Sequence, residues 1–363
     1  MTIFPIHASG ISTLRRSGPL NLALSITAVV GVVSVLLLSV GVSPGNAASA
    51  LWTAAFGTPR SVGETLIRAT PLLIIAVTLV PSLRAGLYNI GAPGQMGAGA
   101  LASTLIAINT DGMSPGIVLP MCAIGGCAAG MLVAFVPGVL KARWKSNEII
   151  STLALNFIVL AVLGYLLNGP MQSDFANLPQ SDALPASSSL PTVIPGTRAH
   201  IGLIIALALV PLLWALDRSR LGYRLRIFGA NPSLARQARV KPGRYLVWLM
   251  TLGGAGAGLA GWMQVAAVDH RLYPSIADPV GYAGLFVALL GALHPLGIVI
   301  AALSLGVLLH GGDSLQVGAG VSPEIVQVLL GLILLAYAVR AGTSTTTSRR
   351  LKGVIQRWSF SKQ

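Results

Sequence analysis

Two neutral amide side chains, Asn89 and Gln95, lie in residues 86–100, which read GLYNIGAPGQMGAGA. The stretch is flanked by apolar segments, yet it carries five glycines and Pro93. Amides form hydrogen bonds without the cost of burying a charge, so they suit an uncharged polar group better than an ion. Glycine and proline interrupt helices. We therefore expect a turn or broken helix here, in which the amides either line a polar path or hold the break in shape.

A second break, GALHPLG at residues 291–297, lies in the other half of the chain. Paired Gly/Pro interruptions in the two halves of a membrane protein point to a central site between them. The chain shows no convincing internal repeat that would support this pairing. A tight interhelical loop at the membrane edge therefore remains the alternative for the first break.

Three polar residues recur at every fourth position in KSNEIISTLALNF, residues 145–157, namely Glu148, Thr152 and Asn156. Asn147 is suited to cap this helix, and a carboxylate at Glu148 is favoured near the positive end of the helix dipole. Polar groups within a span usually face the interior of the bundle. The stripe therefore predicts either helix-to-helix hydrogen bonds or the lining of a polar path.

A basic segment, GANPSLARQARV at residues 229–240, reads as a short amphipathic helix. Asn231 is suited to the N-cap and Pro232 to the first helical position. Arg236 and Arg239 project away from the apolar face. Such a helix rests on anionic lipid or docks a soluble partner.

Several motifs of soluble enzymes are missing or misleading. No GxxxxGK[ST] occurs, so any ATPase that drives this protein must be a separate polypeptide. Residues 256–261 fit GxGxxG, but they lie inside an apolar span without the strand that a dinucleotide site requires. Gly254 and Gly258 are spaced as GxxxG, as are Gly126 and Gly130, which favours close helix packing in a bilayer.

The composition is that of a polytopic membrane protein. Hydrophobic residues make up 54%, charged residues only 9%, and the mean hydropathy is +0.77, whereas soluble domains carry about 25% charged residues. Cys122 and Cys127 lie in an apolar run, and neither a metal cluster nor a nucleophile–base pair is recognisable. We therefore expect an all-α fold with no catalytic residue, metal or cofactor of its own.

Ten membrane spans are expected, several of them short or broken, with soft boundaries: 20–42, 70–88, 91–108, 115–140, 149–168, 200–216, 245–267, 280–293, 295–311 and 323–340. With both termini in the cytoplasm, this count places twenty of the 24 Lys and Arg residues inside. That distribution satisfies the positive-inside rule. The net charge of +14 is therefore interpreted as topological, and no nucleic-acid partner is expected.

These spans divide the chain into a cytoplasmic N-terminal segment at 1–19, a transmembrane domain at 20–340 and a cytoplasmic tail at 341–363. Within the transmembrane domain, residues 169–199 form a Pro- and Ser-rich outside loop, and residues 217–244 form the long basic cytoplasmic loop.

Four blocks of the sequence, in order, carry a family resemblance: residues 85–100, 146–158, 227–240 and 284–303, which read AGLYNIGAPGQMGAGA, SNEIISTLALNFI, IFGANPSLARQARV and GLFVALLGALHPLGIVIAAL. Together they resemble the permease subunits of ABC importers for nucleosides and simple sugars. The chain departs from that family at Pro93, where an acidic residue is common, which puts a polar role of this position in doubt.

The resemblance implies a multi-pass subunit in the bacterial plasma (inner) membrane, in contact with membrane lipids. A cytoplasmic ATPase, which would bind ATP and Mg, would dock on a coupling helix that here comprises Gly229, Asn231, Pro232, Arg236 and Arg239. A second permease, more often a different chain than a copy, would share the pathway. A substrate-binding protein would deliver the solute to the outside face, near residues 169–199.

In this interpretation, the candidate residues of the substrate pathway are Asn89, Gln95, Glu148, Thr152 and Asn156. The alternative is an ion-coupled secondary transporter of a small polar solute, which would bury Asp, Glu or His within its spans. His310 is the main candidate for such a residue. A membrane enzyme or a scaffold is the third class, and no motif supports it.

Overall fold

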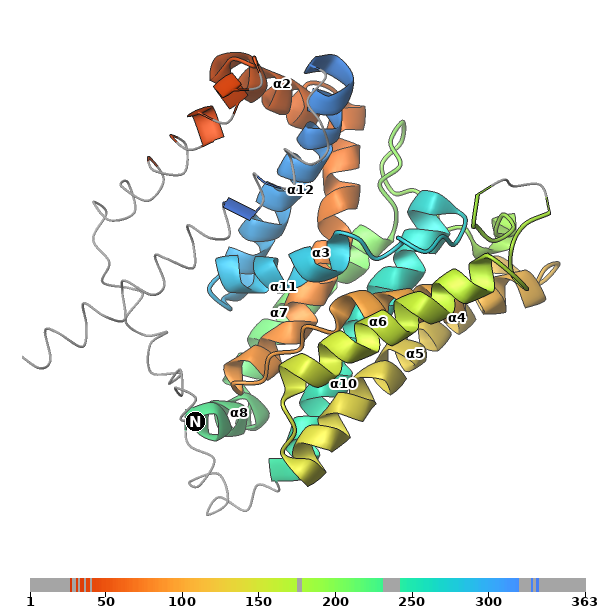
Figure 1. Cartoon of the computed structure of the whole chain (residues 1–363), viewed down its shortest axis with the longest axis vertical. Helices are drawn as coiled ribbons and strands as arrows, with labels where there is room; N and C mark the ends of the chain where they lie inside the picture. Colours follow the sequence, from red (N-terminus) through yellow and green to blue (C-terminus); the bar gives the residue numbers. More distant parts are fainter. Residues whose placement is uncertain are drawn as a thin grey trace, which may run out of the picture. The chain divides into compact units, whose positions relative to one another are not determined.

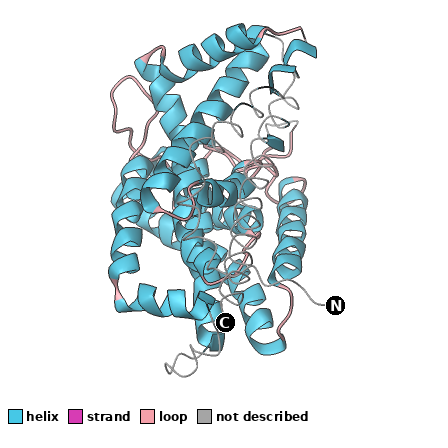
Figure 2. Cartoon of the chain, turned by 90° about the vertical axis from the view of Figure 1, so that its left-hand side faces the viewer, coloured by secondary structure: helices cyan, strands magenta, loops and turns pink. Residues whose placement is uncertain are grey.

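The computed structural model describes residues 41–174, 178–230 and 242–319, with a few further positions between 27 and 39 and between 328 and 332. These residues form helices joined by loops (Figures 1 and 2). Within the described ranges the only β-type pairing is an isolated bridge between Thr192 and His200. The expectation of an all-α fold is thus confirmed for the part of the chain that the structure describes.

The chain contains two compact units. One comprises Ala55–Val307, and the other comprises Met1–Ala54 with Leu308–Gln363. In the second unit Leu37 and Ala47 form a small apolar cluster with Val33, Val42 and Leu51.

The helices follow one another along the chain in this order: α2 Pro44–Phe56, α3 Pro59–Arg84, α4 Ala92–Asn109, α5 Pro115–Trp144, α6 Glu148–Leu167, α7 Gly202–Arg218, α8 Arg220–Ala230, α10 Pro242–Met263, α11 Val280–Leu290 and α12 Pro295–Ala319. A π-helical turn, Gln264–Asp269, continues α10, and a short 3₁₀ turn, Ala186–Ser188, lies in the loop before α7.

Among the described residues, five helices are long and apolar enough to cross a membrane, and up to seven spans result if each bent helix pair counts as one. One such pair is α7 with α8, which meet at 74°. The expected ten spans are therefore not confirmed. The segment expected at 280–293 contains only the 11 residues of α11, about half the length of a span at 1.5 Å per residue. The segments at 20–42 and 323–340 lie largely outside the described residues.

Helix α6 shows the distribution of side chains typical of a bundle in lipid. Its polar residues Glu148, Thr152 and Asn156 are buried, whereas Phe157 and Tyr165 are 72% and 74% exposed. A soluble helix would present the opposite pattern. Only 17% of the apolar window of α6 is buried within the protein, against 83% for α3, so α6 is peripheral and α3 central.

Glycines allow α4, α5 and α10 to pack backbone against backbone (Figure 1). Gly254 and Gly258 of α10 face Gly130 and Gly126 of α5, and a Cβ added at Gly130, Gly254 or Gly258 would clash with a facing carbonyl oxygen. The interpretation of both GxxxG spacings as close helix packing is confirmed. Gly261, the last glycine of the GxGxxG match, faces α4 at Met96 in the same way.

Candidate functional site

The break around Asn89 separates α3 from α4. Helix α3 continues through Pro71 and Pro81 and ends at Arg84. Helix α4 begins at Ala92, directly after Gly91. The turn starts at Gly86, whose φ of +75° favours glycine. The predicted interruption is confirmed.

Asn89 and Gln95 form a closed amide pair inside this break. The Asn89 Nδ2 group donates to Gln95 Oε1 at 3.1 Å, and Gln95 Nε2 donates to Asn89 Oδ1 at 2.9 Å. Asn89 Oδ1 also accepts from the backbone N–H of Gly91 at 2.9 Å, close to the start of α4. Both side chains are fully buried. Their amides therefore hold the break in shape in this conformation.

Asn156 of α6 joins the same break from the neighbouring helix. Its Oδ1 accepts from the Gly94 N–H, and its Nδ2 donates to the Ile90 carbonyl oxygen, both at 2.9 Å. A Cβ added at Gly94 would lie 2.8 Å from Asn156 Oδ1, so only glycine permits this approach. Helix-to-helix hydrogen bonding, one of the two alternatives for the polar stripe, is thus what the structure shows for Asn156.

The other two residues of the stripe are bonded differently. The hydroxyl of Thr152 donates to the Glu148 carbonyl oxygen of its own helix at 2.7 Å, and its Cβ packs beside Gly91. The carboxylate of Glu148 accepts from Lys141 Nζ of α5 at 2.7 Å. Thr152 thus adjoins the amide pair, whereas Glu148 is the first residue of α6 and lies next to the turn between α5 and α6.

The second predicted break, at residues 291–297, separates α11 from α12. Ala292 and Leu293 adopt φ angles of 52° and 58°, a left-handed conformation that costs a residue with a Cβ about 1–2 kcal/mol. At the other end of α11, Gly281 packs directly on Pro93. The start of α11 therefore touches the start of α4, next to the first break, while the second break lies at the opposite end of α11.

The predicted coupling segment is described only at its start. Helix α8 runs to Ala230, with Gly229 near its end, while Asn231, Pro232, Arg236 and Arg239 lie outside the described residues. Leu225 and Phe228 of α8 pack in one apolar cluster with Leu249 of α10. The exposed side of α8 carries Tyr223 together with arginines 224 and 226.

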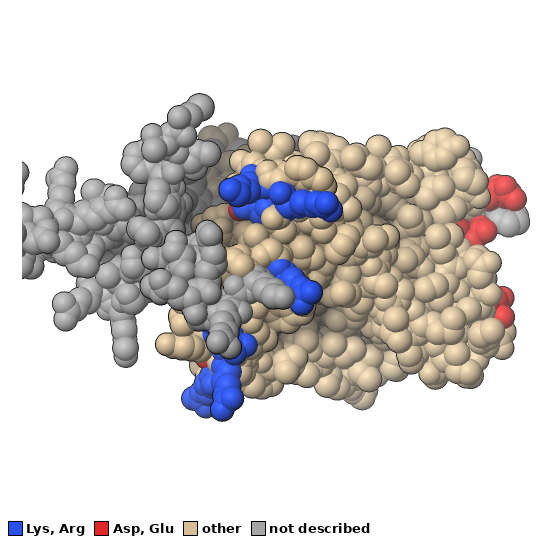
Figure 3. Space-filling model, turned by 90° about the horizontal axis from the view of Figure 1, so that it is seen from below, with Lys and Arg blue, Asp and Glu red and all other residues tan. Residues whose placement is uncertain are grey.

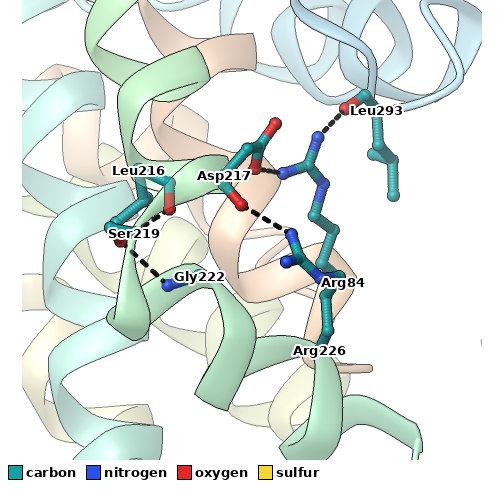
Figure 4. Close-up of polar contacts among 7 residues, drawn as sticks. All are labelled: Arg84, Leu216, Asp217, Ser219, Gly222, Arg226 and Leu293. Carbon is teal, nitrogen blue, oxygen red and sulfur yellow. Dashed lines mark hydrogen bonds and ion pairs between the residues drawn. The ribbon is translucent and has the colours of Figure 1, made fainter.

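Arg84 and Asp217 form a contact network beside α8 (Figure 4). Arg84 Nη1 donates to Asp217 Oδ1 in an ion pair, and Arg84 Nη2 donates to the Leu293 carbonyl oxygen. Arg226 Nη1 donates to the Asp217 backbone oxygen at 2.8 Å. Arg84 lies within the expected span 70–88, and Asp217 directly follows the expected span 200–216. Neither position identifies a hydrogen-bond partner.

On one face of the protein, the exposed charges of the described residues separate by sign. In Figure 3 the Lys and Arg side chains gather toward one end of the view, and the Asp and Glu side chains gather toward the opposite end. This asymmetry is the pattern of the positive-inside rule.

The expected outside loop packs against the chain that follows α10. The backbone N–H groups of Ser181 and Leu190 donate to the carbonyl oxygens of Leu272 and Ala266, both at 2.9 Å. Arg198 forms a bidentate pair with Glu64 at 2.8 and 2.7 Å. The described part of the loop is thus held by hydrogen bonds and an ion pair to the helical domain.

Comparison with known proteins gives a consistent picture. Residues 61–338 match the family described as branched-chain amino acid transport system / permease component. The chain is 33% identical to the glucose ABC transporter permease protein TsgB13 of Haloferax volcanii, covering 88% of each chain. It is 32% identical to the guanosine ABC transporter permease protein NupP of Bacillus subtilis, over 85% of this chain and 90% of that one. It is 31% identical to the nucleoside ABC transporter permease protein NupB of Lactococcus lactis, over 85% and 87%.

Proposed function

Since the chain belongs to the branched-chain amino acid transport system / permease component family, we propose that it is the permease of an ATP-driven importer for a nucleoside or a related ribosyl or simple-sugar solute. A permease subunit of an ABC transporter forms the path through the membrane and is not itself an enzyme. The observation that carries the proposed solute class is the likeness to guanosine, nucleoside and glucose permeases over most of the chain.

The amide pair supports an uncharged solute. Asn89, Gln95 and Asn156 are buried, neutral and hydrogen-bonded, with Thr152 beside them and Glu148 one helical turn further on. We assign these five residues to the wall of the pathway. Because the amides bond to one another in this conformation, a solute reaches them only when the pair opens.

The proposal includes the partners and the topology. An ATPase subunit, which carries ATP and Mg, docks on the segment with Gly229, Asn231, Pro232, Arg236 and Arg239. A different permease chain completes the pathway, and a substrate-binding protein docks at the outside loop 169–199. Ten spans at 20–340, with residues 1–19 and 341–363 in the cytoplasm of a bacterial inner membrane, agree with the charge asymmetry.

The test is uptake of radiolabelled guanosine and of glucose by cells that differ only in this gene. We expect uptake of one of them to require both the gene and cellular ATP. Uptake that survives ATP depletion but collapses with a protonophore would instead support ion-coupled secondary transport. Affinity purification of the tagged chain tests the partners, since the proposal requires an ATPase and a second permease to co-purify.

A further inference from the structure

Arg84 connects three elements through one guanidinium group. It is the last residue of α3, and it donates to the Asp217 carboxylate near the end of α7 and to the Leu293 carbonyl oxygen between α11 and α12 (Figure 4). The side chains of Arg84 and Asp217 are each only 20% exposed. A guanidinium is planar and presents several donors in a fixed fork, so it is able to hold two acceptors at once.

Close packing and a hydrogen bond connect α8 to Arg84 and Asp217. Ser219 begins α8 as a cap, because its hydroxyl donates to Leu216 O at 2.7 Å and accepts from Gly222 N at 3.1 Å. Near its other end, Gly229 packs so closely on the Arg84 backbone that a Cβ would clash with the Arg84 carbonyl oxygen. Arg226 adds a hydrogen bond to the Asp217 backbone. A displacement of α8 must therefore move Arg84, Asp217 or both.

The acceptor at Leu293 belongs to a segment held in an unfavourable conformation. Ala292 and Leu293 are consecutive non-glycine residues with positive φ, which persist only where the surroundings determine them. The Arg84 bond is one such determinant. From this segment α11 runs back to Gly281, which packs on Pro93 beside the Asn89–Gln95 pair. A continuous chain of contacts thus joins α8 to both breaks.

We propose that Arg84 is a positioning residue that transmits movement of α8 to the break at Leu293 and, through α11, to the break at Asn89. Asp217 orients the guanidinium for this task. The inference rests on the proposed function, because the ATPase subunit is what would displace α8 from the adjoining segment. It adds a specific link between the docking segment and the pathway.

The variant Arg84→Lys tests the link, because lysine keeps the charge but loses the fork that bonds both acceptors. Arg224→Lys on the exposed side of α8 is the matched control. Each variant is purified with its partner subunits, and solute transported per ATP hydrolysed is measured in proteoliposomes. We expect ATPase co-purification to be unchanged in both variants and the transport ratio to fall at least tenfold in Arg84→Lys alone.

A second readout does not depend on the solute. Leu296, at the start of α12 and 66% exposed, is changed to Cys in a chain with both native cysteines replaced by alanine. Its labelling by a maleimide is compared with and without ATP and vanadate. We expect a nucleotide-dependent change in labelling rate that Arg84→Lys abolishes and Arg224→Lys preserves.

Asp217→Asn, which removes the ion pair but retains shape, covers the case in which Arg84→Lys does not fold, and we expect the same loss of coupling from it. Retention of the wild-type transport ratio and labelling change in the folded variants would overturn the proposal. Loss of ATPase co-purification in Arg84→Lys would overturn it as well, because the residue would then act in docking. Failure of the wild-type chain to bind any ATPase would refute the proposed function instead.

Discussion

The amide pair predicts a measurable coupling between Asn89 and Gln95. Replacing Asn89 by Ala removes three hydrogen bonds: the two exchanged with Gln95 and the one from the Gly91 N–H. Each contributes about 0.5–1.5 kcal/mol net, and the buried Gln95 amide left behind costs about 1–3 kcal/mol. Side-chain bonds in membrane proteins average nearer 0.6 kcal/mol, so we expect Asn89→Ala to lower the free energy of unfolding by about 3–5 kcal/mol.

Gln95→Ala removes two of the same bonds, so we expect about 1–3 kcal/mol. The double variant should cost about 1–2 kcal/mol less than the sum of the singles, because each single change already removes the shared bonds. The assay is equilibrium unfolding in mixed micelles with increasing SDS, followed by circular dichroism. Asn109→Ala is the control, since this exposed amide bonds only within its own helix, and we expect less than about 0.5 kcal/mol from it.

Strict additivity of the two single variants would refute the pairing seen in the structure. The same variants separate the two roles considered for the amides. If they only hold the break in shape, uptake should fall in parallel with stability across the set. If Gln95 also contacts the solute, Gln95→Ala should reduce uptake more than its loss of stability predicts.

Two further predictions concern packing and the outside loop. Gly258→Ala should destabilise the fold by about 1–3 kcal/mol because its Cβ clashes with a backbone carbonyl of α5, whereas Gly164→Ala, which meets nothing within 4 Å, should be neutral or stabilising by SDS unfolding. Arg198→Ala should lower the free energy of unfolding by less than about 1 kcal/mol, because the Arg198 side chain in the pair with Glu64 is 55% exposed. The same variant should speed amide hydrogen exchange in the loop before α7. An unchanged exchange rate would show that this pair does not hold the loop.

Much of the architecture followed from the sequence. The scarcity of charge identified a membrane protein, and the glycines and prolines located both breaks, because these are local properties of the chain. The polar stripe at Glu148, Thr152 and Asn156 and the GxxxG pairs are periodic patterns, and the structure buries each on the expected face. The count of spans was less accessible, because α11 is apolar throughout yet only half as long as a span.

Only the tertiary structure decided which polar groups bond to one another. Asn89 and Gln95 were recognisable as neutral polar groups, but their mutual pairing depends on the path of the backbone through Gly91. Arg84 looked like one more basic residue at the end of a span. Its acceptors lie 133 and 209 residues further along the chain. Hydrogen bonds require atoms to meet within about 3 Å, and contacts between residues so far apart in sequence are set by helix packing, which no local pattern of residues encodes.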